Sequence, residues 1–128
     1  MRTVTIRTAS GGLSHSVEVG PHHLTADEPA ENGGQDKGPS PHEWVLAGLG
    51  ACTAMTLQVY AKRKEWPLTG VEVSVAGERG EQAFSIQRTI RLQGNLSEEQ
   101  RTRLLEIASK CPVHKTLTGE VRIQSELG

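Results

Sequence analysis

The stretch that decides the fold is residues 41–64, PHEWVLAGLGACTAMTLQVYAKRK, the longest helical pattern in the chain. Ser40 can cap a helix that begins here, because Pro41 suits the first helical position and Glu43 completes a capping box. Three basic residues, 62–64, lie at the C-terminal end, where their positive charges interact favourably with the negative end of the helix dipole. The pattern therefore predicts one continuous helix.

Apolar side chains are distributed around this predicted helix rather than on one stripe. They are Trp44, Val45, Leu46, Leu49, Met55, Leu57 and Val59. A helix that is apolar all round is buried on most of its sides, and we expect that here. Gly48 and Gly50 each weaken the helix by about 1 kcal/mol relative to alanine, which indicates close approach of another segment or a local break.

The rest of the chain reads as short strands and a second helix. Alternation of polar and apolar residues predicts strands over 3–7, 14–19, 24–26, 71–75, 84–92 and 121–125, with a turn at GERGE, residues 77–81. Ser97 and Gln100 form a second capping box, which opens a helix that runs through Ala108. This order predicts an α+β fold, with antiparallel sheets packed around a long buried central helix in a single domain, residues 1–128.

Composition excludes several classes of function. A net charge of −1 gives no electrostatic footprint for nucleic acid or an anionic membrane, and 3% aromatic residues provide few stacking platforms for bases. The N-terminus, MRTVTIRTAS, lacks the apolar region of a signal peptide, and no apolar run approaches the roughly 20 residues of a membrane span. We expect a cytoplasmic protein with no nucleic-acid or membrane partner.

A loop rich in glycine, proline and acidic residues precedes the long helix. It reads DEPAENGGQDKGPSP over residues 27–41 and lacks the Gly-Lys-Ser/Thr ending of a phosphate-binding loop. The composition favours mobility over nucleotide binding.

Only two cysteines occur, Cys52 in GLGACTAMT and Cys111 in KCPVHKTL. Cys111 shares a helix face with Leu104 and Ile107, and Pro112 places it at the N-cap of a new helical turn. Free backbone N–H groups there favour the thiolate, whereas the apolar neighbours of Cys52 oppose it. Local surroundings thus favour Cys111 as the reactive thiol, and Cys52 needs a cation from elsewhere in the fold.

Three interpretations of the two cysteines stay open on these grounds. In the first, the cysteines are two separate buried side chains that only pack. In the second, both cysteines bind a metal ion together with His114, although no fourth ligand is evident. In the third, they form a redox pair in which one thiol attacks a peroxide and the other resolves the product.

The two segments GGQDKGPSPHEWVLAGLGACTAMTL and KCPVHKTL resemble the OsmC/Ohr family, the osmotically inducible and organic hydroperoxide resistance proteins. The resemblance implies an intertwined homodimer with active sites at the dimer interface. It also implies a thiol peroxidase that reduces organic hydroperoxides without a cofactor or metal. In that family pattern Cys52 is the peroxidatic cysteine, Cys111 is the resolving cysteine, and an external dithiol restores both.

The chain departs from the family pattern at two positions. His42 stands where the family has its catalytic glutamate, and Leu13 stands where it has its catalytic arginine. Glu43 would lie on roughly the opposite face of the helix from Cys52, and about 13 Å from it along the helix axis. We assign His42 and Glu43 supporting roles, with Arg7, His15 and His22 as candidate cations.

These departures predict a divergent branch of the family. The alternative function is a non-turnover redox-sensing or small-molecule-binding protein that keeps the fold without the activating Arg-Glu pair.

Overall fold

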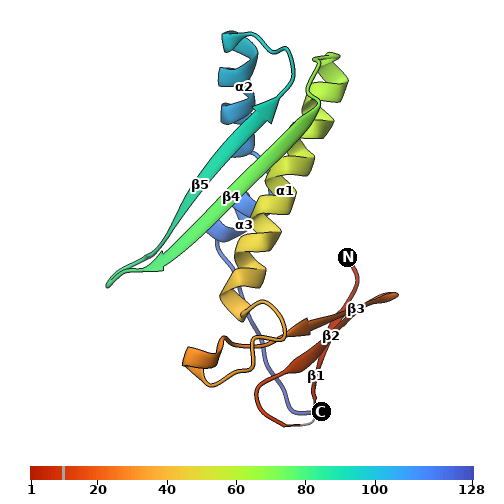
Figure 1. Cartoon of the computed structure of the whole chain (residues 1–128), viewed down its shortest axis with the longest axis vertical. Coiled ribbons are helices and arrows are strands. Elements are labelled where there is room, and N and C mark those ends of the chain that lie inside the picture. Colours follow the sequence, from red (N-terminus) through yellow and green to blue (C-terminus); the bar gives the residue numbers. More distant parts are fainter. Residues whose placement is uncertain (10) are drawn as a thin grey trace. The chain divides into compact units, whose positions relative to one another are not determined.

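A computed structural model, which describes residues 1–9 and 11–128, confirms a mixed α+β fold with antiparallel sheets and a long helix (Figure 1). Its elements are β1 (Val4–Thr8), β2 (His15–Val19), β3 (His22–Ala26), η1 (Ala30–Asn32), α1 (Pro41–Lys64), β4 (Gly70–Arg79), β5 (Phe84–Gln93), α2 (Glu98–Ala108) and α3 (Pro112–Thr118). The chain divides into two compact units, Met1–Val45 and Leu46–Gly128. The assignment of residues 1–128 to a single domain stays a prediction.

The first unit contains a three-stranded antiparallel sheet in the order β1-β2-β3. Its register places Ile6 opposite Val17 and Val17 opposite Leu24, so that one face of the sheet is apolar. On the other face, the Arg7 guanidinium donates a hydrogen bond to the Glu18 carboxylate. The three strands confirm the prediction that was based on the alternation of polar and apolar residues.

The loop that follows β3 has a defined conformation, although its composition favoured mobility. The buried carboxylate of Asp27 accepts hydrogen bonds from the backbone N–H groups of Glu28, Gln35 and Lys37 at 2.8, 3.2 and 3.1 Å. These bonds, led by the one from Glu28, lower the pKa of Asp27. One side chain thus organises the connection between β3 and α1.

The second unit is built around the contact of α1 with α2 and the β4–β5 hairpin (Figure 1). Its buried core consists of Leu57, Ala61, Leu96, Leu104, Ile107 and Ala108. The predicted capping box of α2 is present, since Gln100 N donates to Ser97 Oγ and Ser97 N donates to Gln100 Oε1. Local capping and a shared apolar core therefore place α2 against α1.

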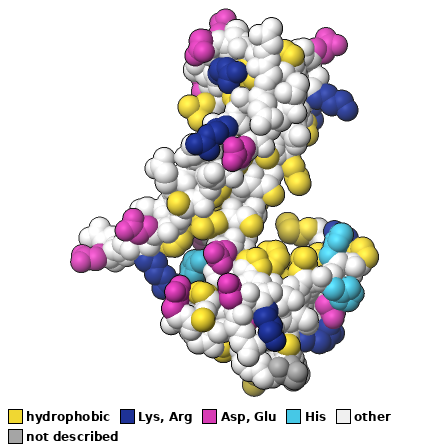
Figure 2. Space-filling view, viewed as in Figure 1, with side chains coloured by type: hydrophobic (Ala, Val, Ile, Leu, Met, Phe, Trp, Pro, Cys, Tyr) yellow, Lys and Arg dark blue, Asp and Glu magenta, His cyan; other side chains and the backbone are white. Residues whose placement is uncertain are grey.

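In this chain α1 is buried on one side rather than on most sides. Its buried residues, Leu49, Thr53, Leu57 and Ala61, follow one another at intervals of four and form a single stripe. Met55 and Val59 on another face are 63% and 50% exposed. Apolar side chains accordingly reach the molecular surface (Figure 2). One copy of the chain has too few elements to cover every face of a helix of 24 residues.

The helix continues without a break through its two glycines. A Cβ atom on Gly50 would lie 3.3 Å from Val75 Cγ2, so β4 approaches α1 closely at this residue. A Cβ atom on Gly48 would meet nothing within 4 Å. Close approach therefore explains Gly50 but not Gly48.

By length and composition alone, α1 could cross a membrane, contrary to the sequence-based expectation. An 18-residue window of it has a mean hydropathy of 1.3 and is 22% buried. Core helices of soluble proteins meet the same criterion, so the finding is weak evidence for a span.

Two predicted elements differ from the structure. The strand over residues 121–125 is not formed, and Val121 and Ile123 are 58% and 85% exposed. A strand needs a neighbour for its backbone hydrogen bonds, and among the described residues no strand pairs with this segment. The β4–β5 turn lies at 80–83 rather than at 77–81, because Gly77 continues β4 beneath the ring of Phe84.

Candidate thiol site

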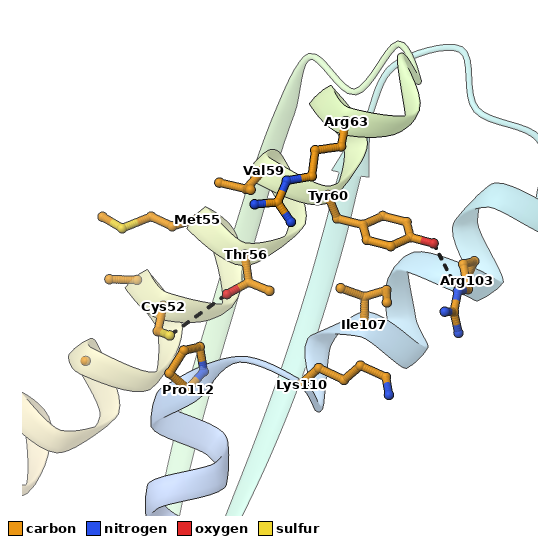
Figure 3. Close-up of a pocket in the computed structure, with 12 residues that line it drawn as sticks. Cys52, Met55, Thr56, Val59, Tyr60, Arg63, Arg103, Ile107, Lys110 and Pro112 are labelled. Carbon is orange, nitrogen blue, oxygen red and sulfur yellow. Dashed lines mark hydrogen bonds between the residues drawn. The ribbon is translucent and has the colours of Figure 1, made fainter.

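Cys52 lies on α1 and is half-buried at the wall of a cavity of about 820 Å³. The α1 side of the cavity is formed by small and apolar residues that include Gly48, Met55 and Val59. Ile107 from α2 and Pro112 from α3 line it across from Cys52 (Figure 3). The open space beside Gly48 therefore belongs to the cavity that Cys52 faces.

Three basic residues, Arg63, Arg103 and Lys110, also line this cavity, and none of the described residues that line it is acidic. Arg103 is held in place, because its Nε donates to Tyr60 Oη at 3.1 Å and its Nη1 donates to Glu106 Oε2 at 2.9 Å. These two hydrogen bonds raise the pKa of Arg103. The cavity thus combines an apolar wall with three basic side chains, of which Arg103 is ion-paired with Glu106.

The Thr56 hydroxyl is a hydrogen-bonding partner of the Cys52 sulfur, at 4.0 Å from Sγ to Oγ1 (Figure 3). No hydrogen bond joins the three cations to the Cys52 sulfur in the described part of the chain. These three residues were missed in the sequence, because Arg103 on α2 and Lys110 in the turn after α2 lie far along the chain from Cys52, although Arg63 is on the same helix as Cys52.

Cys111 is the N-cap of α3, as its position before Pro112 predicted. Its backbone is extended, with φ −64° and ψ 139°, and its Sγ accepts a hydrogen bond from His114 N at 3.3 Å. The thiol is fully buried together with Leu104, Ile107 and Ala108, the face that helical spacing assigned to it.

A polar network surrounds the buried Cys111 sulfur. Thr53 Oγ1 lies 3.9 Å from Cys111 Sγ and accepts a hydrogen bond from Arg88 Nη1 at 3.0 Å. Arg88 Nη2 lies 3.2 Å from His114 Nδ1. Arg88 was missed in the sequence, although it occupies an inward position of a strand whose other inward positions, such as Ile86 and Ile90, are apolar. A charged residue in that register is the signal that could have revealed it.

The structure brings the surroundings of both cysteines to the same part of α1. Thr53, which contacts Cys111, directly follows Cys52, and both thiols are free. Within the described residues no three His, Cys, Asp or Glu side chains gather to hold a metal ion. The alternative metal site of Cys52, Cys111 and His114 is therefore not formed.

Glu43 caps α1, as the capping box predicted. Its carboxylate accepts a hydrogen bond from Ser40 N at 2.8 Å, and Glu43 N donates to Ser40 Oγ at 3.4 Å. The bond from the Ser40 backbone is the main reason why the pKa of Glu43 is lowered. Glu43 and the exposed His42 belong to the first unit, and their supporting roles stay predictions.

An α+β fold whose long helix carries one free thiol at a cation-lined cavity, with a second free thiol buried nearby, defines a two-cysteine thiol protein. The sequence profile of the OsmC-like protein family matches residues 34–126. The chain belongs to this family, which confirms the resemblance seen in its two cysteine segments.

Solved structures share the fold over nearly the whole chain. An OsmC-like protein from Mycoplasma pneumoniae has a TM-score of 0.80 at 24% identity, over 93% of this chain and 88% of that one. An osmotic stress induced and detoxification response protein from Psychrobacter arcticus has a TM-score of 0.77 at 21% identity, over 91% and 88%.

The organic hydroperoxide resistance protein OhrB of Bacillus subtilis has a TM-score of 0.66 at 23% identity, over 93% of this chain and 91% of that one. No curated protein matches the sequence. At these identities the similarity shows a common fold.

Proposed function

We propose that this protein is a thiol peroxidase that reduces organic hydroperoxides, with Cys52 as the peroxidatic and Cys111 as the resolving cysteine. The observation that carries the proposal is the position of Cys52 in an apolar cavity lined by Arg63, Arg103 and Lys110. The apolar wall suits the organic group of a hydroperoxide, and positive charge favours the attacking thiolate. Membership of the OsmC-like family supports the same assignment.

The chemistry requires two thiols and no cofactor. The Cys52 thiolate attacks the distal peroxide oxygen, the O–O bond breaks, and the leaving alkoxide takes a proton and departs as the alcohol. Cys52 is thereby oxidised to a sulfenic acid. The Cys111 thiol then attacks the sulfenic sulfur, water leaves, and a disulfide forms. An external dithiol reduces this disulfide by thiol exchange and is itself oxidised to a disulfide.

A second copy of the chain is the proposed partner. Met55 and Val59 expose an apolar face of α1 beside Cys52, and a homodimer that covers this face would enclose the cavity. We expect a dimer that buries more than the roughly 1,600 Å² of a standard interface. Light scattering at micromolar concentration measures the mass, and a monomer there would contradict the expectation.

The test of the reaction compares the two cysteine variants. Peroxide should convert the wild type into an intramolecular disulfide, about two mass units lighter than the dithiol. Cys111→Ser should consume one equivalent of cumene hydroperoxide and stop at a sulfenic acid on Cys52 that dimedone traps. Cys52→Ser should consume almost none. If Cys52→Ser kept its reactivity and Cys111→Ser lost it, the roles would be exchanged.

One observation favours a second candidate, a redox-sensing protein without turnover. The Cys52 sulfur contacts a threonine hydroxyl at 4.0 Å, and Leu13 and His42 replace the activating pair of the family pattern. Steady-state peroxide consumption with a dithiol reductant separates the two functions. A sensor consumes one equivalent per thiol pair and stops, whereas a peroxidase consumes peroxide until the reductant is exhausted.

A further inference from the structure

The second unit contains another cavity, of about 290 Å³, that shares no lining residue with the cavity of Cys52. Its walls come from α1, β5 and α3. Leu49, Ile86 and Leu117 contribute apolar surface, while Arg88 and His114 contribute the charged and polar groups. None of these five residues lines the cavity where Cys52 is proposed to meet the peroxide, although His114 N donates to the Cys111 sulfur, so this second cavity requires a separate explanation.

Among the residues that the structure describes, no carboxylate pairs with the guanidinium of Arg88. Arg88 is half-buried, and the ion pairs formed among the described residues do not include it. Its hydrogen bonds to Thr53 and His114 use two of its five N–H groups, which leaves three for other acceptors. A half-buried cation with spare donors favours an anion beside it, because an opposite charge offsets the cost of desolvation.

The same two hydrogen bonds fix the guanidinium in place. Arginine always donates, so His114 Nδ1 accepts from Arg88 and the ring carries its proton on Nε2. Thr53 is fully buried and its own hydroxyl donates to Leu49 O at 2.7 Å, so it presents only a lone pair to Arg88. A guanidinium held through both of its Nη atoms loses little conformational entropy when a ligand binds.

We propose that this cavity is a binding site for a small apolar monocarboxylate. Arg88 pairs with the carboxylate through its free N–H groups, which suit a planar anion with two oxygen atoms. Leu49, Ile86 and Leu117 contact the apolar body of the ligand. The volume lies at the lower end of the range for ligand pockets, roughly 300–1,000 Å³, so the ligand has the size of an aromatic acid with one ring.

Benzoate is the probe, and benzamide, which has nearly the same shape without the charge, is the matched ligand. Titration of the wild type, followed by NMR of the Leu, Ile and Met methyl groups, should show saturable shifts at Ile86 and Leu117 with benzoate and much weaker ones with benzamide. Arg88→Gln should weaken benzoate binding at least about tenfold, the effect of losing a charge-assisted pair. Arg91→Gln is the control, since Arg91 lies on the same strand and instead pairs with Glu72.

A second variant guards against misfolding of Arg88→Gln, because Arg88 also supports Thr53. Leu117 is 42% exposed, so Leu117→Trp can fill the mouth of the cavity while Arg88 and its partners stay unchanged. It should abolish benzoate binding and retain the wild-type circular dichroism spectrum. Equal binding of benzamide would overturn the proposal, as would equal losses in the Arg88 and Arg91 variants or full binding by Leu117→Trp. Shifts confined to Met55 and Ile107 would place the anion at the cavity of Cys52 and also overturn it.

Both cysteines can be replaced by serine in this experiment. Loss of peroxidase activity would then coexist with unchanged benzoate binding, so failure of the proposed reaction and failure of the carboxylate site are distinguishable.

Discussion

Thr53→Val should destabilise the protein although it leaves no cavity. The substitution replaces a hydroxyl by a methyl group of similar volume at a site that is fully buried. It removes the acceptor for Arg88 Nη1, a charge-assisted hydrogen bond whose loss costs roughly 1.5–3 kcal/mol. Because Arg88 is half-buried, its freed N–H group is partly hydrated, and we expect about 1.5–2 kcal/mol, the lower part of that range.

The other bond of the Thr53 hydroxyl contributes little to this difference. Its acceptor, Leu49 O, also receives the backbone N–H of the next helical turn, and such bonds of threonine to the preceding turn slightly disfavour a helix. The matched control is Thr56→Val, one turn along the same helix. The hydroxyl of Thr56 makes a long contact of 4.0 Å with Cys52 Sγ and does not receive a hydrogen bond from a charged group in the described part of the chain, so we expect a change within about 0.5 kcal/mol.

Urea unfolding at one fixed protein concentration measures both variants. With a slope of roughly 1–3 kcal/mol per molar urea, Thr53→Val should lower the midpoint by about 1 M and leave the slope unchanged. The variant Arg88→Met then tests the assignment. The double variant should cost at least about 1 kcal/mol less than the sum of the single variants. A Thr53 variant as stable as the Thr56 variant, or additive costs in the cycle, would refute this account of the network.

Three further predictions concern stability. Leu104→Ala should lower the free energy of unfolding by about 3–5 kcal/mol because Leu104 is fully buried, whereas Leu105→Ala should lower it by less than about 1 kcal/mol because Leu105 is 62% exposed. Urea midpoints measure both variants, and equal losses would contradict the burial of this face of α2. Ser97→Ala should lower the free energy of unfolding by about 1 kcal/mol, because it removes the capping box of α2. Ser109→Ala at the other end of the helix is the control, and a larger loss for Ser109→Ala would argue against the cap. The pKa of Asp27 in the folded state lies below the reference value of 3.8, so the stability that its carboxylate contributes is fully present above about pH 5 and is lost as pH falls through the lowered pKa. The difference in thermal midpoint between wild type and Asp27→Asn should therefore stay constant from pH 7 to about pH 5 and shrink below about pH 4, and a difference independent of pH would show that Asp27 does not titrate with unfolding.

Several local features could be predicted because each depends on residues close together in the chain. The start of α1 follows from Ser40 and Glu43, the start of α2 from Ser97, and the N-cap position of Cys111 from Pro112. The alternation of polar and apolar residues located the strands of both sheets. Strand 121–125 could not be decided this way, because a strand forms only when another strand pairs with it and the alternation does not specify that neighbour.

The sequence by itself determined the fold class, the family and the candidate thiols, because helix capping, alternation and the two cysteine segments are local patterns. Only the tertiary structure decided what surrounds each thiol. Arg63 on α1, Arg103 on α2 and Lys110 in the turn after α2 line the cavity of Cys52, while Arg88 reaches Thr53 and His114 from a strand. Arg103 and Lys110 lie far from Cys52 in the chain, as Arg88 does from Thr53, and each comes close only because α1 packs against α2 and the β4–β5 hairpin. Electrostatic interactions depend on distance in space, so spacing in the sequence does not show which sulfur each charge approaches.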